Sequence, residues 1–320
     1  MKVVFYASDK PREHALAKAL AEGLTQYGDT FELRRTADYG EDDLGNDLRW
    51  SGPTPDTDVV CVFGVKGRSK QIMQEHMDIG KTALYFDKGY SREKGGEAGQ
   101  TLYSRVCVNA ASPVKYMMRV QRDSDRWMNL SLKLPKLSNN KSGHVLVAMS
   151  SQKYQDFYGL GDATHYAAKI VLRIWKDYGK QIVYRPKPSW RGAVAVPFAQ
   201  YSRPPHTIED ALRGAYCVVT HGSSAPFDAI QLGIPSICLG PSICAPVSSE
   251  SLDHLDDLYW ASERERFQWA SNMAYCQWTA DELRTGYAWQ YIKEEIEYQL
   301  KHVIAREDKK LDSKKNKRAQ

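Results

Sequence analysis

Short apolar runs alternate with helical patterns along most of the chain, and this alternation narrows the folds that the chain can adopt. KVVFYA (residues 2–7) and HVLVAMS (144–150) have the length of buried strands, whereas PREHALAKALAEGL (11–24) has the periodicity of an amphipathic helix. Strands that are separated by helices usually pair in parallel, because each crossover helix returns the chain to the same end of the sheet. The predicted fold class is therefore α/β, with doubly wound parallel sheets.

The alternation starts again after LKLPKLSNNKSGH (132–144), a polar, proline-containing stretch typical of a linker. We therefore expect two Rossmann-like domains, 1–135 and 143–278, which face each other across a cleft. The sequence TADE (279–282) is a capping box, and it predicts a helix over 279–305 that returns to the first domain. The tail, 306–320, has seven basic and three acidic residues, and we expect it to be disordered.

Composition excludes several classes of protein. The net charge of +5 is concentrated in the tail, so any anionic partner must be bound by local patches. No apolar run approaches the roughly 18 to 20 residues that cross a bilayer, and we expect a cytoplasmic protein without a membrane partner. The six cysteines form no CxxC pair and read as reduced core residues. GLGDAT (159–164) lacks the third glycine of a dinucleotide fingerprint, and the acidic DHLDD (253–257) is better explained as an exposed helix face than as a metal site.

One apolar run, CVVTH, ends at a histidine and is followed by small polar residues and an acid. Ligands of an open parallel sheet bind beyond the carboxyl ends of its strands, which is where His221 is predicted to lie. Gly222, Ser223 and Ser224 form a turn whose amides and hydroxyls can hold a phosphate at the start of a helix. Asp228, six residues beyond the glycine, can accept hydrogen bonds from ribose hydroxyls.

Two other strand ends of the second half carry polar residues. Arg185 and Lys187, in IVYRPK, alternate on one strand face and form a candidate diphosphate clamp. Ser150 and Ser151 follow HVLVAM. Each group has a simpler explanation: a core histidine at 221, serines that only cap a helix, and basic residues in surface ion pairs.

This arrangement resembles the donor-binding domain of GT-B fold glycosyltransferases, from the basic strand end YRPKP through HGSSAPFD to GIP and the next strand. The resemblance implies that Asp228 holds the nucleotide ribose and that Gly222 to Ser224 lie against the diphosphate. Many relatives have glutamate where this chain has aspartate. It also implies a nucleoside diphosphate sugar as co-substrate, UDP-linked in our expectation, with no further cofactor and no catalytic metal.

The first half offers a candidate base and a basic rim. Asp87 directly follows the apolar run TALYF and can take a proton from an attacking hydroxyl, although an aspartate in a turn is the simpler explanation. Basic side chains interleaved with aromatics suit a nucleic acid, and a solvated charged face is again the alternative. The candidate DNA-binding residues are Lys66, Arg68, Lys70, Lys88, Tyr90 and Arg92.

The elements DKGY (87–90) and QWTADELRTGYAW (277–289) resemble segments of bacteriophage enzymes that glycosylate hydroxymethylated pyrimidines in DNA. By its residues alone, the second element is a capped helix with Trp278 and Trp289 as packing anchors. The predicted function is transfer of a hexose or pentose to 5-hydroxymethyl pyrimidine in DNA, inverting the anomeric centre, with Asp87 as base. A glycan acceptor, or a non-catalytic protein that binds nucleotides or nucleic acid, stays as an alternative.

Overall fold

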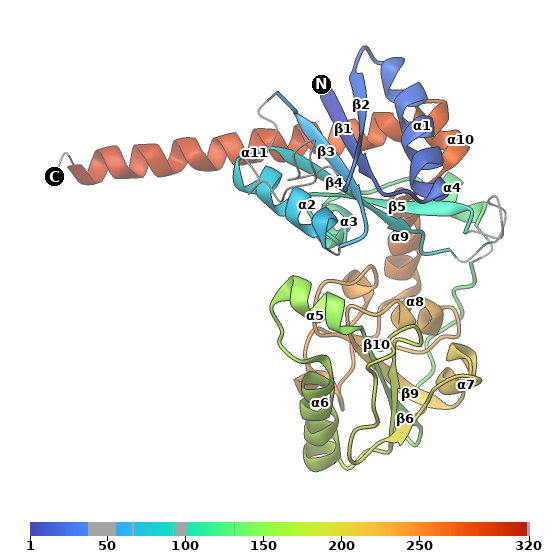
Figure 1. Ribbon diagram of the computed structural model, residues 1–320. Coiled ribbons are helices and arrows are strands. Elements are labelled where there is room, and N and C mark those ends of the chain that lie inside the picture. The colour runs from blue at the N-terminus through green and yellow to red at the C-terminus, as the bar shows by residue number, and fades with distance from the viewer. Residues whose placement is uncertain (38–55, 66, 92, 94–100, 131, 319–320) are drawn as a thin grey trace.

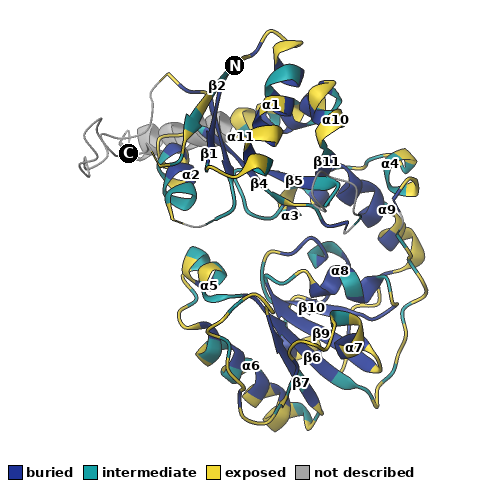
Figure 2. Ribbon diagram, turned by 45° about the vertical axis from the view of Figure 1, so that its right-hand side comes forward, coloured by how far each residue is buried: buried dark blue, intermediate teal, exposed yellow. Residues whose placement is uncertain are grey.

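The computed structural model describes residues 1–37, 56–65, 67–91, 93, 101–130 and 132–318, with side chains described as far as residue 302. Within these residues the chain forms two α/β domains, each built on one sheet (Figure 1). The central strands of both sheets are buried, whereas the edge strand β2 and the outer faces of the helices carry exposed residues (Figure 2). The predicted fold class, two Rossmann-like domains that face each other with a C-terminal helix returning to the first, is confirmed.

The first sheet has the strand order β11-β5-β4-β3-β1-β2. Its strands are β1 (Lys2–Ala7), β2 (Thr30–Arg35), β3 (Val59–Phe63), β4 (Thr82–Lys88), β5 (Tyr103–Val108) and β11 (Gln277–Thr279). The strands β1 to β4 pair in parallel, whereas β5 is antiparallel to both of its neighbours. The expected doubly wound half therefore has an antiparallel strand near one edge, as many doubly wound sheets do.

Helices α1 (Pro11–Thr25) and α2 (Arg68–Asp78) cover opposite faces of this sheet. The short helices α3 (Val114–Arg119) and α4 (Asp125–Met128) follow β5 along the chain. On one face, α1 and the C-terminal helix pack on Val3, Phe5 and Phe86. On the other face, Ile72 and Met73 of α2 lie in a cluster with alternating strand residues.

The second sheet is wholly parallel, with the order β10-β9-β6-β7-β8. Its strands are β6 (His144–Met149), β7 (Ile182–Pro186), β8 (Gln200–Tyr201), β9 (Ala215–His221) and β10 (Ser236–Cys238). The helical segments of this half are α5 (Gln152–Tyr158), α6 (Ala163–Tyr178), α7 (Ile208–Leu212), α8 (Ala225–Ile230), η2 (Ala245–Val247), η3 (Leu252–His254) and α9 (Glu263–Ala274). Asp162 caps α6 and Thr207 forms a capping box for α7, which explains where these two helices begin.

An apolar cluster joins the two halves of the molecule. Tyr90 of the first domain lies in it with Phe227 and Ile230 of α8, and Trp269 of α9 completes its centre. The amide of Asn272, also on α9, donates to the carbonyl oxygens of residues 117 and 120 at 2.9 and 2.8 Å. The chain therefore passes back to the first domain along α9, before the boundary that the sequence suggested at 278.

The capping box at Thr279 is present and opens α10 (Ala280–Arg284). The expected single helix is instead two, because α11 (Tyr287–Arg318) begins after a short break. Helix α11 continues well past the predicted end, through the tail that we expected to be disordered (Figure 1). Buried Asp29 anchors α11 to the first domain by accepting from Trp289 Nε1 at 2.8 Å and from Lys293 Nζ at 2.9 Å.

Candidate functional site

The order of strands in the second sheet reverses between β6 and β9, and two of the predicted strand ends meet at that point. Met149, the last residue of β6, lies opposite His221, the last residue of β9. Ser150 and Ser151 therefore leave the sheet beside Gly222. Reversal points of this kind are where open parallel sheets bind ligands.

His221 lies at this point, at the end of β9. It is buried, and its Nδ1 lies 2.7 Å from the hydroxyl of Tyr166 on α6. Burial lowers the pKa of His221, so its imidazole is neutral at neutral pH. The contacts of His221 match the simpler explanation, a buried histidine with a hydrogen-bond partner. His221 stays a candidate site residue because it directly precedes the turn at Gly222.

The turn after His221 has its own internal bonds. The Ser223 amide donates to Thr220 Oγ1 at 3.1 Å, and Ser223 Oγ accepts from the Ala225 amide at 3.2 Å. Ser224 precedes α8, makes no capping bond and is exposed. Asp228 is half-buried and lies in the first turn of α8, as the sequence predicted.

The two basic residues of the predicted clamp differ in their surroundings. Arg185 is 7% exposed and donates to Ser202 Oγ and to the His206 carbonyl, both at 2.9 Å. Burial lowers its pKa. Arg185 therefore holds the loop between β8 and α7, whereas Lys187 follows the end of β7 and is exposed.

Sequence reasoning missed α5, which follows β6 and lies over the turn. The Tyr154 ring lies against Gly222, whose φ is +81° and where an added Cβ would be 1.9 Å from Tyr154 Cζ. Tyr158 of the same helix packs on Tyr154 with ring centroids 4.6 Å apart. The spacing of Tyr154, Phe157 and Tyr158 directly after a strand end was the available signal, because positions three and four apart share a helix face.

In the first domain, Asp87 lies near the end of β4 and is held by three donors. Its Oδ2 accepts from Tyr85 Oη at 2.6 Å and from Arg105 Nη2 at 2.8 Å, and its Oδ1 accepts from the Lys88 amide at 2.8 Å. Burial opposes the charged form, but the positive charge of Arg105 and these hydrogen bonds outweigh it and hold the pKa of Asp87 below its usual value. Asp87 is therefore a carboxylate at neutral pH.

The carboxyl-terminal edges of the two sheets face each other. Tyr90, which follows β4, packs on Phe227 of α8 with ring centroids 6.3 Å apart. Lys70 of α2 donates to the Asp156 carbonyl of α5 at 3.0 Å. The two candidate sites therefore lie on opposite sides of one interdomain space.

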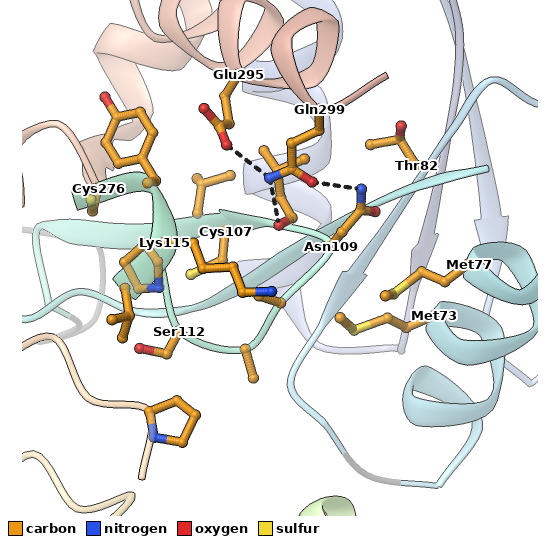
Figure 3. Close-up of a pocket in the computed structure, with 18 of the residues that line it drawn as sticks. Met73, Met77, Thr82, Cys107, Asn109, Ser112, Lys115, Cys276, Glu295 and Gln299 are labelled. Carbon is orange, nitrogen blue, oxygen red and sulfur yellow. Dashed lines mark hydrogen bonds between the residues drawn. The ribbon is translucent and has the colours of Figure 1, made fainter. Parts of the chain in front are cut away.

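A cavity of about 1050 Å³ lies in this space, lined from one side by α2, the β5–α3 connection and α11, and from the other by α5 and the segment after β10 (Figure 3). Cys107, Ser112 and Lys115 are on its first-domain wall and Tyr158 is on the other. Arg105 is two residues from Cys107 on β5, so both side chains are on the same face of the strand. Asp87 and Arg105 themselves are not among the residues that line the cavity, and neither are the predicted donor-site residues of the second domain.

The predicted DNA-binding rim is only partly assembled. Tyr90 was expected on an exposed rim, but it is 7% exposed, because it fills the cluster between the domains. Lys70 is directed to α5, with its Nζ also 5.8 Å from the Phe157 ring centroid. Arg68 begins α2 and Lys88 is exposed, whereas positions 66 and 92 (Lys66 and Arg92) lie outside the described residues.

In the described part of the chain, no group of three or more His, Cys, Asp or Glu residues could hold a metal ion. Asp253 of the acidic DHLDD stretch instead pairs with Arg173. None of the described helices has both the length and the apolar character needed to span a membrane.

No family model matches the sequence, and no curated protein matches it. Among solved structures, the β-Kdo 2,4 transferase of Thermosulfurimonas dismutans KpsC is 13% identical, with 85% of this chain and 90% of that chain covered at a TM-score of 0.48. The β-Kdo 2,7 transferase of the same KpsC is 12% identical, with 89% and 97% covered at 0.49. The UDP-GlcNAc 2-epimerase of Methanocaldococcus jannaschii, solved with UDP-GlcNAc and UDP, is 12% identical, with 80% and 87% covered at 0.30.

Proposed function

We propose that the protein transfers a sugar from a nucleoside diphosphate sugar to a hydroxyl group of an acceptor. The observation that carries the proposal is the facing of the two sheet edges, with a strand-order reversal point on one side and the Asp87 carboxylate on the other. A two-substrate transfer needs both reactants held in one space from which water can be excluded.

The donor site of this proposal is the reversal point of the second sheet. Ser150, Ser151, Ser224 and exposed Lys187 are the groups that would contact the diphosphate, and the Asp228 carboxylate would accept from the ribose hydroxyls. The turn Gly222–Ser223 lies against the diphosphate, and neutral His221 donates or accepts one hydrogen bond beside it. Arg185 supports this site by holding the adjacent loop. We propose UDP as the carrier.

The reaction that we propose is a direct displacement with Asp87 as base. The acceptor oxygen bonds to the anomeric carbon, the bond from that carbon to the diphosphate oxygen breaks, and the nucleoside diphosphate leaves with the electron pair. The hydroxyl proton passes to Asp87. Oδ2 already accepts two hydrogen bonds but Oδ1 accepts only the Lys88 amide among the contacts described, so Oδ1 has a lone pair for the acceptor. Attack opposite the leaving group inverts the anomeric centre, and the reaction consumes no cofactor.

For the acceptor we propose 5-hydroxymethyl pyrimidine in DNA. The positive charges of Lys88, which follows Asp87 on β4, and of Arg68, at the start of α2, support an anionic strand. Burial of Tyr90 removes one expected stacking residue, so charge is the main support. A glycan acceptor is the alternative outcome of the experiment below.

The test is incubation of the protein with a panel of nucleotide sugars and three acceptors: hydroxymethylated DNA, unmodified DNA and oligosaccharides. Mass analysis should find one sugar added per modified nucleoside, with one nucleoside diphosphate released per transfer. Product on oligosaccharides alone would assign a glycan acceptor. Nucleotide binding without release under any condition would show a binding protein and refute the transferase.

A further inference from the structure

Helix α5 covers the turn at which the proposed donor diphosphate would bind. The Tyr154 ring is in direct contact with Gly222, since a Cβ there would lie 1.9 to 2.4 Å from three ring carbons. The Tyr154 hydroxyl donates to the Pro241 carbonyl beyond the turn, at 3.4 Å. The ring therefore occupies the side of Gly222 on which a side chain would stand, and a phosphate oxygen cannot approach the turn from that side.

We propose that α5 is a cover of the donor site, which Tyr154 closes and which nucleotide binding must displace. The proposal rests on the donor site proposed above and adds its regulation. The internal bonds of the turn fit a covered state, because the Ser223 and Ala225 amides are occupied by Thr220 Oγ1 and Ser223 Oγ rather than available to an anion. Uncovering the turn and rearranging these bonds would make the site competent.

The cover is also attached to the other domain. Lys70 Nζ donates to the Asp156 carbonyl at 3.0 Å and lies 5.8 Å from the centroid of the Phe157 ring. Displacement of α5 therefore breaks a contact between the domains. Donor binding and the relative position of the domains are coupled through this one helix.

The closed position of α5 buries a polar side chain at a cost in free energy. Gln155 is fully buried, yet neither its Nε2 nor its Oε1 has a hydrogen-bond partner among the residues that the structure describes. A buried amide without partners disfavours the conformation that buries it. The chain leaves α5 through Gly159, Leu160 and Gly161, a short connection that can act as a hinge. The cover is therefore held closed by Lys70 and Tyr154 and weakened by Gln155.

Calorimetric titration of UDP into the full-length protein tests the cover, because some variants should bind UDP more tightly than the wild type and another should bind it more weakly. If the closed state dominates about tenfold, Tyr154→Ala should tighten UDP binding by about 3- to 10-fold, because it raises the fraction of competent protein. Lys70→Ala should change the affinity in the same direction. Gln155→Leu, which removes the unpaired amide, should weaken it. Tyr154→Phe keeps the ring but loses the hydrogen bond to the Pro241 carbonyl, so its affinity should lie between those of the wild type and Tyr154→Ala.

Hydrogen exchange of residues 152–158 supplies a readout that needs no ligand. Lys70→Ala and Tyr154→Ala should both speed exchange in this segment, and UDP should do the same in the wild type. Weaker UDP binding by Tyr154→Ala would show that the ring stacks on the nucleotide, and it would overturn the cover. Unchanged exchange in Lys70→Ala would overturn the attachment. If neither the wild type nor any variant binds UDP or another nucleoside diphosphate, but Lys70→Ala and Tyr154→Ala still speed exchange, then α5 is a mobile helix and the donor site itself is wrong.

Discussion

Asp87 and Arg105 lie opposite each other on the antiparallel strands β4 and β5, with 2.8 Å between the Asp87 Oδ2 and the Arg105 Nη2. Tyr85 Oη donates to the same oxygen, Asp87 Oδ2. Because Arg105 and Tyr85 both hold Oδ2, they also fix the direction in which Asp87 Oδ1 points. The ion pair has a structural role in the sheet, and the same geometry leaves a charged, partly exposed carboxylate near the end of β4. The two roles predict different results on mutation.

Asp87→Asn keeps the shape of the side chain and removes the proton acceptor. Transfer should fall by about 10²- to 10⁴-fold in kcat, the usual contribution of a general base, with the affinity for UDP unchanged. Steady-state rates and calorimetric titration of the same preparation measure both. Turnover within a few-fold of the wild type would remove Asp87 from the chemistry and leave it as the partner of Arg105.

The Asp87 ion pair also predicts how stability responds to acid. Because the folded pKa lies below the ordinary value of about 3.9, the charged form contributes stability that is complete above that value. The contribution is lost as the pH falls through the folded pKa. The Tm of the wild type should therefore exceed that of Asp87→Asn at about pH 6, and the gap should shrink from about pH 5 to pH 3. A gap that is constant over this range would contradict the assignment.

Periodicity predicted the architecture because most strands here are continuous apolar runs, and most helices have an apolar face or a capping residue. The short β8 and β11 were missed, because two or three residues carry no period. Periodicity also could not predict that β5 runs antiparallel to its neighbours, because the hydrophobic pattern of a buried strand is the same in either direction. Each depends on contacts between segments far apart in the chain.

In the candidate site, too, the sequence predicted where residues lie but not which contacts they make. Strand ends predicted that Ser150 and His221 would meet, because parallel strands deliver their carboxyl ends to one edge. What each side chain does there depends on neighbours that the sequence order does not reveal: Ser202 and His206 engage Arg185, and Phe227 buries Tyr90. A basic or aromatic residue near a strand end is therefore weak evidence of exposure to a ligand.

Mutation of Arg185 should mainly lower stability, whereas mutation of Lys187 should mainly weaken UDP binding. Arg185→Ala leaves the Ser202 hydroxyl and the His206 carbonyl without their partner, and it should lower the free energy of unfolding by about 1 to 3 kcal/mol. Lys187→Ala should change it by less than about 0.5 kcal/mol, because the side chain is exposed. It should instead weaken UDP binding by about tenfold, the loss of one charge-assisted hydrogen bond. Equal UDP affinities for the wild type and Lys187→Ala would refute the phosphate contact.

Gly23 fixes how closely the returning segment approaches the first domain. An alanine Cβ at this position of α1 would lie 1.9 Å from the Leu283 carbonyl oxygen of α10, so the two helices would have to separate. Alanine ordinarily stabilises a helix relative to glycine, but here Gly23→Ala should destabilise the protein by about 1 to 3 kcal/mol through overpacking. Lys18→Ala, at an exposed position of the same helix, is the matched control and should stay within about 0.5 kcal/mol of the wild type. Urea denaturation followed by tryptophan fluorescence measures both variants, since Trp278 and Trp289 are buried beside this contact. An increase in stability for Gly23→Ala would show that α10 does not pack on α1 in solution.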